Sequence, residues 1–461
     1  MNIDIKKILY FILISHLILW TAFPTIFNQN LPLDTIEGLV WGNELKLGYD
    51  KYPPIFPLFT ELFYKFFGNQ DWAYYLLSQL FVISSFIVVF NFSKYFFNNE
   101  AHSLIAVLLL ESIYFFNYTT PELNAFIPLF LFLGCTALFC WRAIIFNKTF
   151  DWIMFGIFAG ISSLTYYLAL YLLAALGLYF IREIITNKKI NYKYFITLIT
   201  YFIILSPHLY YIYSENLKSV EYALFRSFGD PLSGISQEKL FDHLLYPVIF
   251  LVKQILILIP LLLLIRLVIS SYKIRIDFKD RKLIFLFFIT FVPIILMFIT
   301  SLIGGIRVRT MWMTTFYVFP GIFFVYLFNS NILLEKFKKF YTIFLFIFLM
   351  LPIAYGTDSY IQKDKRTDFP GKEIARLVQN KWDDNFVNDI KIVVGDEWSA
   401  GNLSYHLSSR PAWFNDLKGI ADNISEDQGV IYVGNPEILK KICPGVFGEI
   451  KPTGYCMIGM R

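Results

Sequence analysis

Charged residues are scarce in this chain of 461 residues, since Asp, Glu, Lys and Arg together make up 16% of it. A soluble domain contains about 25% of these residues. Hydrophobic residues reach 57%, which is more apolar surface than a water-soluble fold can bury. The shortage of charge therefore excludes an ordinary soluble enzyme and predicts segments that face lipid. The net charge of +5 is expected to lie in cytoplasmic loops, so no nucleic-acid partner is predicted.

Cysteine is also rare, and the four cysteines fall into two pairs. Cys135 and Cys140 lie in an apolar run and are expected to be buried as small hydrophobic residues. Cys443 and Cys456 lie in the polar C-terminal tail. They form a disulfide if the tail is periplasmic, or remain two free thiols. Internal repeats and low-complexity tracts are absent from the sequence, which excludes repeat architectures.

Long apolar stretches dominate the first three quarters of the chain. A transmembrane helix needs about 20 apolar residues. The first stretch follows Lys6 and Lys7 and lacks a cleavage site, so we expect a retained signal-anchor helix. The region 151–182 is either two short spans or one span with a re-entrant piece. In total eleven spans are predicted, near 8–27, 72–93, 101–117, 123–142, 151–166, 167–182, 194–213, 244–270, 283–303, 313–329 and 340–356.

Lys and Arg in the short loops predict the orientation of these spans. Every second loop is basic and lies on the same side as Lys6 and Lys7, which places the N-terminus in the cytoplasm. The opposite, periplasmic side then carries the loops 28–71 and 214–243 and the tail 357–461. The tail contains two short strand-like runs, at 390–394 and 429–434, and a helical pattern over 372–382. We therefore predict a polytopic α-helical membrane domain, 1–356, and a small periplasmic α/β domain, 357–461.

The first periplasmic loop carries the clearest candidate chemistry. Asp34 and Glu37 are three residues apart, so on a helix they share one face. The stretch 36–47 is amphipathic enough to lie along the membrane surface, and Pro53-Pro54 then ends one helix and begins another. Carboxylates at a membrane surface suit deprotonation of an acceptor hydroxyl. A solvated acidic turn is the alternative interpretation.

Three further segments place polar groups at periplasmic helix ends. Glu122 and Asn124 stand at the mouth of the fourth span, where Glu122 is either functional or a favourable charge at a helix N-terminus. His208 is a candidate proton carrier, a metal ligand or a satisfied interfacial histidine. Arg307 and Arg309 run against the positive-inside trend and either bind phosphate, together with Lys51, or anchor the chain to lipid headgroups.

Taken in order, these segments resemble one family, the bacterial GT-C glycosyltransferases that include protein O-mannosyltransferases and the aminoarabinose transferase of lipid A. The family has adjacent Asp and Glu after the first span, whereas Asp34 and Glu37 are three apart here. Its Gly-Tyr-x-Lys-His-Pro-Pro-Leu motif matches Gly48 to Ile55, with Tyr52 in place of His. The other similar segments are Thr119–Phe130, Trp141–Ala143, Leu164–Tyr167, Ser206–Leu209, Gly395–Trp398 and Ser408–Pro411.

The resemblance implies an inverting glycosyltransferase in the bacterial inner membrane with a polyprenyl-phosphate sugar donor and a cell-envelope acceptor, such as lipid A, another glycan or a protein. It implies Asp34 as the base, with Glu37 and Glu122 as further catalytic carboxyls, and Lys51, Arg307 and Arg309 around the donor phosphate. Tyr52, Asn124 and His208 are then expected to bind substrate.

No cofactor is expected, although some relatives use a divalent metal, for which Asp50 is a candidate ligand. The alternative functions are a lipid or sugar transporter, or flippase, and a non-catalytic scaffold whose tail binds an envelope partner. Transporters tend to place ionisable groups and broken helices near the membrane midplane, often in repeated halves. The polar groups singled out above lie at helix ends instead.

Overall fold

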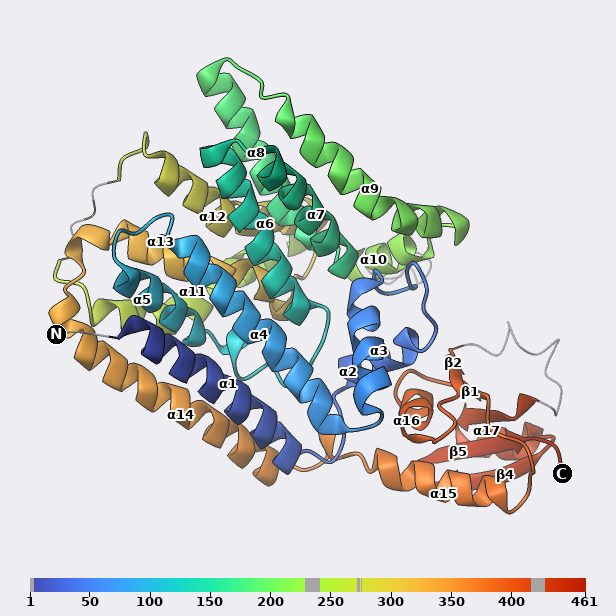
Figure 1. Ribbon diagram of the computed structural model, residues 1–461. Coiled ribbons are helices and arrows are strands. Elements are labelled where there is room, and N and C mark those ends of the chain that lie inside the picture. Colours follow the sequence, from blue (N-terminus) through green and yellow to red (C-terminus); the bar gives the residue numbers. More distant parts are fainter. Residues whose placement is uncertain (1–3, 229–240, 272–273, 275, 416–427) are drawn as a thin grey trace.

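A computed structural model of the chain describes residues 4–228, 241–271, 274, 276–415 and 428–461. It consists of a large assembly of helices and a small sheet domain at the C-terminal end (Figure 1). The two termini lie at opposite ends of the molecule. Parts of the predicted loop 214–243 and of the basic loop that holds Lys273 and Arg275 lie outside the described residues.

Eight of the described helices are long and apolar enough to cross a membrane. Their outward faces carry large exposed hydrophobic side chains, such as Ile18, Phe202 and Leu263, which suit contact with lipid. The eight helices are α1 (Ile5–Phe27), α4 (Asp71–Ser93), α6 (Phe126–Phe146), α8 (Ala169–Asn187), α9 (Lys193–Ser214), α11 (Asp242–Arg266), α12 (Arg281–Gly304) and α14 (Phe337–Ile361).

The remaining three predicted spans are helical but short or broken, so the count of eleven is not confirmed. The segment 101–117 becomes α5 (Glu100–Glu111), which ends early and is followed by the 3-10 turn Tyr114–Phe116. The segment 151–166 becomes the 17-residue α7 (Thr149–Thr165), separate from α8. The segment 313–329 becomes a 3-10 helix, Thr310–Val318, and α13 (Pro320–Leu327), which meet at 53°. Counting this bent pair as one span gives nine in the described chain.

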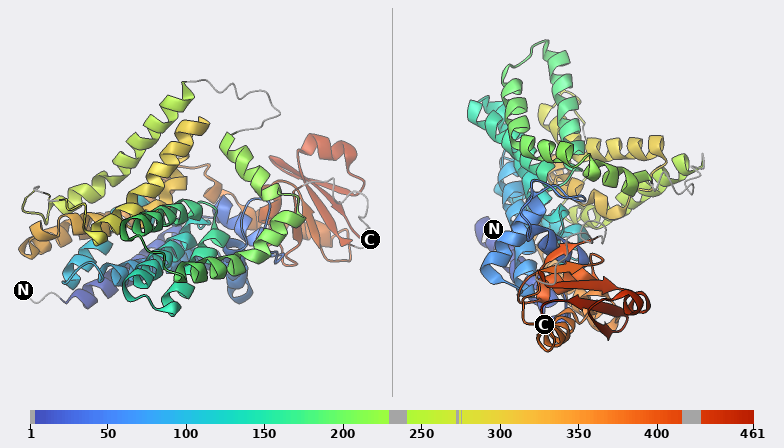
Figure 2. Two further views of the ribbon diagram at one scale, coloured as in Figure 1. Left: turned by 90° about the horizontal axis from the view of Figure 1, so that it is seen from above. Right: turned by 90° about the vertical axis from the view of Figure 1, so that its right-hand side faces the viewer.

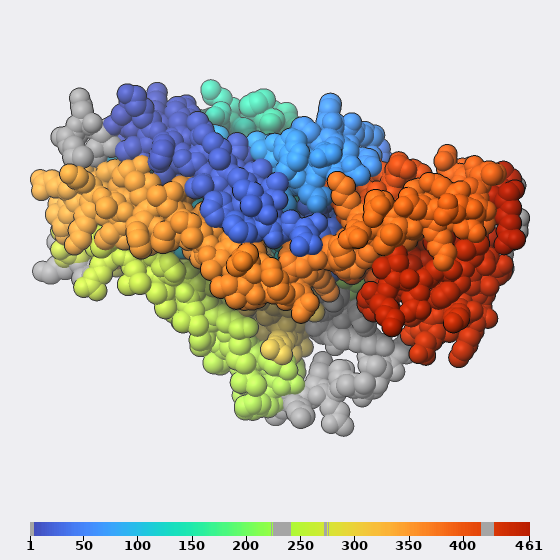
Figure 3. Space-filling model, turned by 90° about the horizontal axis from the view of Figure 1, so that it is seen from below, coloured from blue at the N-terminus to red at the C-terminus, as the bar shows by residue number. Residues whose placement is uncertain are grey.

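The helices pack in sequence-distant pairs around an aromatic and aliphatic core. Helix α1 lies along both α4 and α14, and α14 follows it along the surface (Figure 3). Helix α6 contacts α4 and α7, and α7 contacts α9. Helices α11 and α12 run side by side at the flank of the assembly (Figure 2). Buried Trp20, Trp141 and Trp152 fill the spaces between these helices.

Two short helices join the membrane helices to the C-terminal domain. Helix α2 (Leu33–Gly42) begins after Pro32, and α3 (Ile55–Phe67) begins directly after Pro54, as the proline pair predicts. The expected surface helix over 36–47 therefore starts earlier and ends at Gly42. Gly42 allows α2 and α3 to approach closely, because a Cβ there would collide with the carbonyl oxygen of Pro57. This close hairpin fixes the direction in which α2 presents its side chains.

The C-terminal domain is a five-stranded mixed sheet with helices packed against it. The strand order is β2-β1-β3-β5-β4; β1 is parallel to β2 and β3, and β5 is antiparallel to β3 and β4. Trp382, Val393 and Ile431 lie in its core. The predicted α/β fold is confirmed. Its elements are α15 (Gly371–Asp383), β1 (Ile392–Val394), α16 (Ser399–His406), β2 (Ala412–Phe414), β3 (Val430–Gly434), α17 (Pro436–Ile442), β4 (Val446–Ile450) and β5 (Thr453–Ile458).

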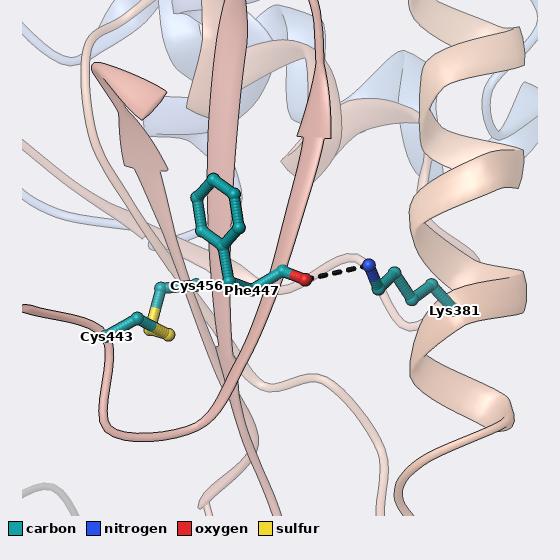
Figure 4. The surroundings of a disulfide bond; sticks show 4 residues. All are labelled: Lys381, Cys443, Phe447 and Cys456. Carbon is teal, nitrogen blue, oxygen red and sulfur yellow. Dashed lines mark hydrogen bonds between the residues drawn. A yellow bond between two sulfur atoms is a disulfide. The ribbon is translucent and has the colours of Figure 1, made fainter. Parts of the chain in front are cut away.

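A disulfide links Cys443, at the end of α17, to Cys456 in β5 (Figure 4). Of the two alternatives that the sequence left open, the structure therefore has the bridge. On the other side of the sheet, Lys381 Nζ in α15 donates to the carbonyl oxygen of Phe447 in β4, 2.8 Å away. The lysine thus contacts strand β4 at the sheet edge, and the disulfide ties the segment that precedes β4 to β5.

The C-terminal domain is docked on the α2–α3 hairpin by buried polar contacts. Arg410 Nη2 donates to Glu61 Oε2 at 2.6 Å and to the Leu39 carbonyl oxygen at 3.0 Å. The Arg410 guanidinium also lies over the ring of Tyr64, 3.3 Å from its centroid. Nearby, Asn30 Nδ2 donates to Asn402 Oδ1 at 2.7 Å. These contacts place residues of the tail against the hairpin that carries Asp34 and Glu37.

Candidate active site

A cavity of about 580 Å³, here called the central cavity, opens where the hairpin, the membrane helices and the C-terminal domain meet. Its walls come from α2 and the loop after it, the turns before α6 and α8, α10 (Lys218–Phe228), the segment after α12 and the tail. Charged side chains of both signs line it. They are Asp34, Glu37, Lys51, Glu122, Arg309, Arg366 and Glu397.

Glu37 and Lys51 form the most deeply buried ion pair of this cavity. Lys51 Nζ donates to both carboxylate oxygens of Glu37 at 2.6 Å, and the Glu37 side chain is 0% exposed. The Tyr52 hydroxyl donates to Glu37 Oε2 at 3.4 Å, and Lys51 Nζ also lies 3.5 Å from Glu397 Oε2. One lysine thus joins carboxylates from α2 and from the C-terminal domain.

Burial raises the pKa of Glu37 to about 9, with further contributions from its hydrogen bond to Glu397 and from the charge of Asp34. Lys51 opposes this shift, but burial outweighs it. Burial would lower the pKa of Lys51, yet the Glu37 carboxylate beside it raises that pKa above its usual value. Lys51 therefore keeps its charge, and Glu37 holds a proton far more tightly than an exposed carboxyl group does.

Glu122 faces the central cavity from the turn that precedes α6. Its side chain is open to the cavity, but the surrounding protein limits its hydration. This loss of hydration raises the pKa of Glu122 to about 7; the charge of Asp34 acts in the same direction and Arg366 opposes it. Asn124 Oδ1 accepts from the backbone N–H of Phe126 at 3.0 Å and so fixes the start of α6 beside Glu122.

Only one of the two arginines after α12 lines the central cavity. The chain is extended there, with Ile306 and Val308 buried and Arg307 and Arg309 exposed. Arg309 lines the central cavity together with Trp312. Arg307 does not line it, so the structure brings only one member of this pair to the other candidate residues.

His208 lies outside the central cavity and supports the loop that leads to Lys51. Its Nε2 is 2.8 Å from the Tyr167 hydroxyl and its Nδ1 is 2.9 Å from the Leu47 carbonyl oxygen. A Cβ on Gly48 would collide with the His208 ring, so the loop passes very close to it. Both ring nitrogens thus have partners within the protein.

Arg366 and Glu397 line the cavity but were not among the predicted site residues. Glu397 belongs to the Gly395–Trp398 segment that carried part of the family resemblance. That resemblance was the sequence signal that could have identified Glu397 as a site residue. Asp396 Oδ1 accepts from the N–H groups of Trp398 and Ser399 and caps α16, which leaves Glu397 to face the cavity. Arg366 follows two lysines after the last span, and nothing in that local pattern distinguishes it from them.

In the described part of the chain, no three His, Cys, Asp or Glu side chains are grouped so that they could hold a metal ion. Asp50, the candidate ligand, lines a neighbouring cavity instead of the central one. The expectation of a metal-independent site stays a prediction.

Comparison with known proteins gives a family match and a fold match. Residues 51–211, about a third of the chain, match the family model of dolichyl-phosphate-mannose-protein mannosyltransferases. The crystal structure of ArnT from Cupriavidus metallidurans bound to undecaprenyl phosphate matches with a TM-score of 0.59 and 10% identity, over 98% of each chain. The apo structure of the same protein has a TM-score of 0.49 and 11% identity, also over 98% of each chain. No curated protein matches this sequence.

Proposed function

We propose that this chain, a multi-pass membrane glycosyltransferase of the GT-C superfamily, moves a sugar from a polyprenyl-phosphate donor to an acceptor hydroxyl at the periplasmic face of the inner membrane. The observation that carries this proposal is the central cavity, where carboxylates of α2 and the turn before α6 face Lys51, Arg309 and Arg366. A base and a set of phosphate-binding cations are the two requirements of this reaction.

Asp34 acts as the base in this proposal. It takes the proton of the acceptor hydroxyl, and the acceptor oxygen bonds to the anomeric carbon from the face opposite the phosphate. The bond from that carbon to the phosphate oxygen breaks, and polyprenyl phosphate leaves with the bonding electrons. The anomeric configuration is inverted, as in single-displacement reactions at sugars. Glu122, in the turn before α6, orients the acceptor.

Lys51, Arg309 and Arg366 hold the donor phosphate and stabilise the charge that grows on it. Arginine binds phosphate with two parallel hydrogen bonds, and lysine acts as a point charge. The crystal structure with the matching fold contains undecaprenyl phosphate, which supports a donor of this chemical class. Arg307, which does not line the cavity, takes no part in this arrangement.

The periplasmic placement rests on two features. The basic loops lie on the side of the N-terminus, as expected for cytoplasmic segments. The disulfide of the C-terminal domain requires an oxidising compartment, which is the periplasm in bacteria. A transporter is not favoured, because both the matching family model and the matching fold belong to glycosyltransferases.

Transfer of radiolabelled sugar from polyprenyl-phosphate donors tests the proposal in membranes that contain wild type or Asp34→Asn. We expect the variant to lose transfer by about 100-fold or more, as removal of a general base does. Asp384→Asn, an exposed acid at the end of α15, is the matched control and should transfer normally. Persistent transfer by Asp34→Asn would assign the base to Glu37 or Glu122. Absence of transfer by wild type from every donor would contradict the function itself.

A further inference from the structure

A second cavity, of about 320 Å³, adjoins the central one and is here called the outer cavity. It lies between the loop after α2, the end of α9, α10 (Lys218–Phe228) and strand β2 of the C-terminal domain. The two cavities share Lys51, Tyr222 and Glu397 as wall residues. A molecule in the outer cavity would therefore border the charged groups of the central one.

Aromatic rings from both parts of the protein form one wall of the outer cavity. The Trp41 ring of α2 stacks on Trp413 of β2, with centroids 6.3 Å apart and planes at 23°. It also stacks on Tyr49, at 5.5 Å and 27°. Tyr211 and Tyr222 contribute further aromatic surface. Flat aromatic faces suit the apolar C–H faces of sugar rings, and polar groups at the edge suit sugar hydroxyls.

The charge of the outer cavity restricts which sugars fit. Three acids, Glu44, Asp50 and Glu397, and two lysines, Lys46 and Lys51, line it. Lys46 Nζ lies 2.6 Å from Glu44 Oε2, and Lys51 Nζ lies 3.5 Å from Glu397 Oε2. The acids of the outer cavity outnumber its lysines by one, and this excess of negative charge disfavours phosphate or carboxylate groups on a ligand.

We propose that the outer cavity is the acceptor subsite and that it binds a carbohydrate without negative charge, either neutral or an amino sugar. This inference rests on the proposed function, because an acceptor is needed only if the chain transfers sugar. Trp41 is buried beneath Trp413 and Tyr49, so a sugar ring would stack on the accessible part of Trp413. Such a ring sits next to Lys51 and Glu397, from where a hydroxyl can enter the central cavity. The C-terminal domain, which supplies Trp413, then selects the acceptor.

A protein acceptor is the competing possibility and has its own structural expectation. Strand β2 is at the edge of the sheet, so an extended peptide would bind by adding a strand beside it. This mode uses backbone hydrogen bonds and does not need the stacked tryptophans. Truncation of Trp413 therefore separates the two modes.

Binding is measured by saturation-transfer NMR and calorimetry on the full-length protein in detergent micelles. The probes are mannotriose, triacetylchitotriose, chitosan triose, a phosphorylated mannotriose and a nine-residue Ser/Thr peptide. We expect at least one uncharged or amino trisaccharide to bind, and the phosphorylated one to bind at least ten-fold more weakly than mannotriose. Trp413→Ala should weaken saccharide binding at least ten-fold. Trp72→Ala, at the exposed start of α4, should not change it.

Trp413→Tyr keeps an aromatic face and should restore most of the binding, which distinguishes lost stacking from misfolding. Undecaprenyl-phosphate binding is measured on the same samples and should survive in Trp413→Ala. Preserved undecaprenyl-phosphate binding without any saccharide binding would overturn the inference alone. Binding of the peptide only, or preference for the phosphorylated saccharide, would also overturn it. Failure to bind undecaprenyl phosphate in wild type would instead count against the proposed function.

Discussion

Lys51 is the residue on which the charges of the central cavity depend. Its ammonium group donates to both oxygens of the buried Glu37 carboxyl and also contacts Glu397. Because the raised pKa of Glu37 lets it take up a proton, loss of Lys51 costs mainly these buried hydrogen bonds, about 1–3 kcal/mol. Lys51→Met is therefore expected to lower the free energy of unfolding by a few kcal/mol and to abolish sugar transfer.

The double variant Lys51→Met/Glu37→Gln separates these two effects. It replaces both members of the buried pair, so most of the thermal stability should return, as measured by the melting temperature in detergent. Sugar transfer and polyprenyl-phosphate binding should stay impaired, because the phosphate has lost a cation. Recovery of activity along with stability would contradict the role of Lys51 in phosphate binding.

Glu122 predicts a specific pH dependence. Its folded-state pKa is raised to about 7, so the carboxylate forms only as the pH rises through that value. If ionised Glu122 orients the acceptor, transfer should fall about ten-fold for each pH unit below about 7. The raised pKa also means that the folded protein binds this proton more tightly than the unfolded chain does. Ionisation of Glu122 therefore lowers the free energy of unfolding, and thermal stability should decline as the pH rises from the usual carboxyl pKa through 7.

The measurement for Glu122 is the rate of transfer between pH 5.5 and 8.5 in wild type and Glu122→Gln. The variant should be slower at pH 8 and should lose the acid limb near pH 7. An acid limb that persists unchanged in Glu122→Gln would assign that titration to another group. Asp384→Asn is a control whose pH profile should match that of wild type, because its side chain is exposed and does not line the cavity.

At the scale of single residues, the sequence predicted part of the candidate site. Asp34 and Glu37 were expected to share a helix face, and both line the central cavity from α2. Glu397 and Arg366 reach the same cavity from more than three hundred residues away, and local spacing carries no information on such contacts. The buried network of His16, Gln79 and Glu111 was also not predicted, because each residue is isolated within its own apolar helix.

At the scale of elements, the α2–α3 hairpin determines where the α2 carboxyl groups lie. Gly42→Ala should destabilise the hairpin by about 1–3 kcal/mol, as overpacking does, because the added Cβ meets the Pro57 carbonyl oxygen. Activity should fall with it, since α2 carries Asp34 and Glu37. Gly177→Ala in α8 is the matched control, because a Cβ there has no atom within 4 Å.

Thermal unfolding and transfer rates are compared for the two glycine variants. Gly177→Ala should be neutral or slightly more stable, since alanine favours helices over glycine by about 1 kcal/mol. Equal behaviour of the two variants would show that the close approach at Gly42 does not matter.

The helices themselves were largely predictable, because every predicted apolar stretch forms a helix in the structure. The residues at which the helices end were not predictable. Helix α5 gives way to a 3-10 turn at Tyr114–Phe116, and Pro320 begins a new helix at an angle to the preceding turn. Hydropathy alone does not report such breaks, because the residues on both sides of each break are equally apolar.

At the scale of the whole molecule, Arg410 holds the C-terminal domain against the hairpin. Its side chain is 12% exposed and that of its partner Glu61 is 7% exposed. Arg410→Ala leaves Glu61 without compensation and is expected to cost about 3 kcal/mol or more of docking free energy. Hydrogen exchange should rise in α2 and α3, and sugar transfer should fall because Glu397 loses its position beside Lys51.

Arg376→Ala, at an exposed site on α15, is the control for Arg410→Ala and should leave both hydrogen exchange and transfer unchanged. The melting transition of the C-terminal domain itself should stay in place in both variants, since neither side chain lies in its core. A lower melting temperature of that domain in Arg410→Ala would indicate misfolding instead of undocking.

The composition of the central cavity has a consequence for biosynthesis. Asp34 and Lys51 are translated near the beginning of the chain, whereas Arg366 and Glu397 follow the last membrane helix. A nascent chain can therefore complete this cavity only after its last membrane helix and the tail as far as Glu397 have been synthesised. A chain released before that point would carry the carboxylates of α2 without Arg366 and Glu397. Completion of the cavity is in this sense a late step of biosynthesis, and the tail is the final part to arrive.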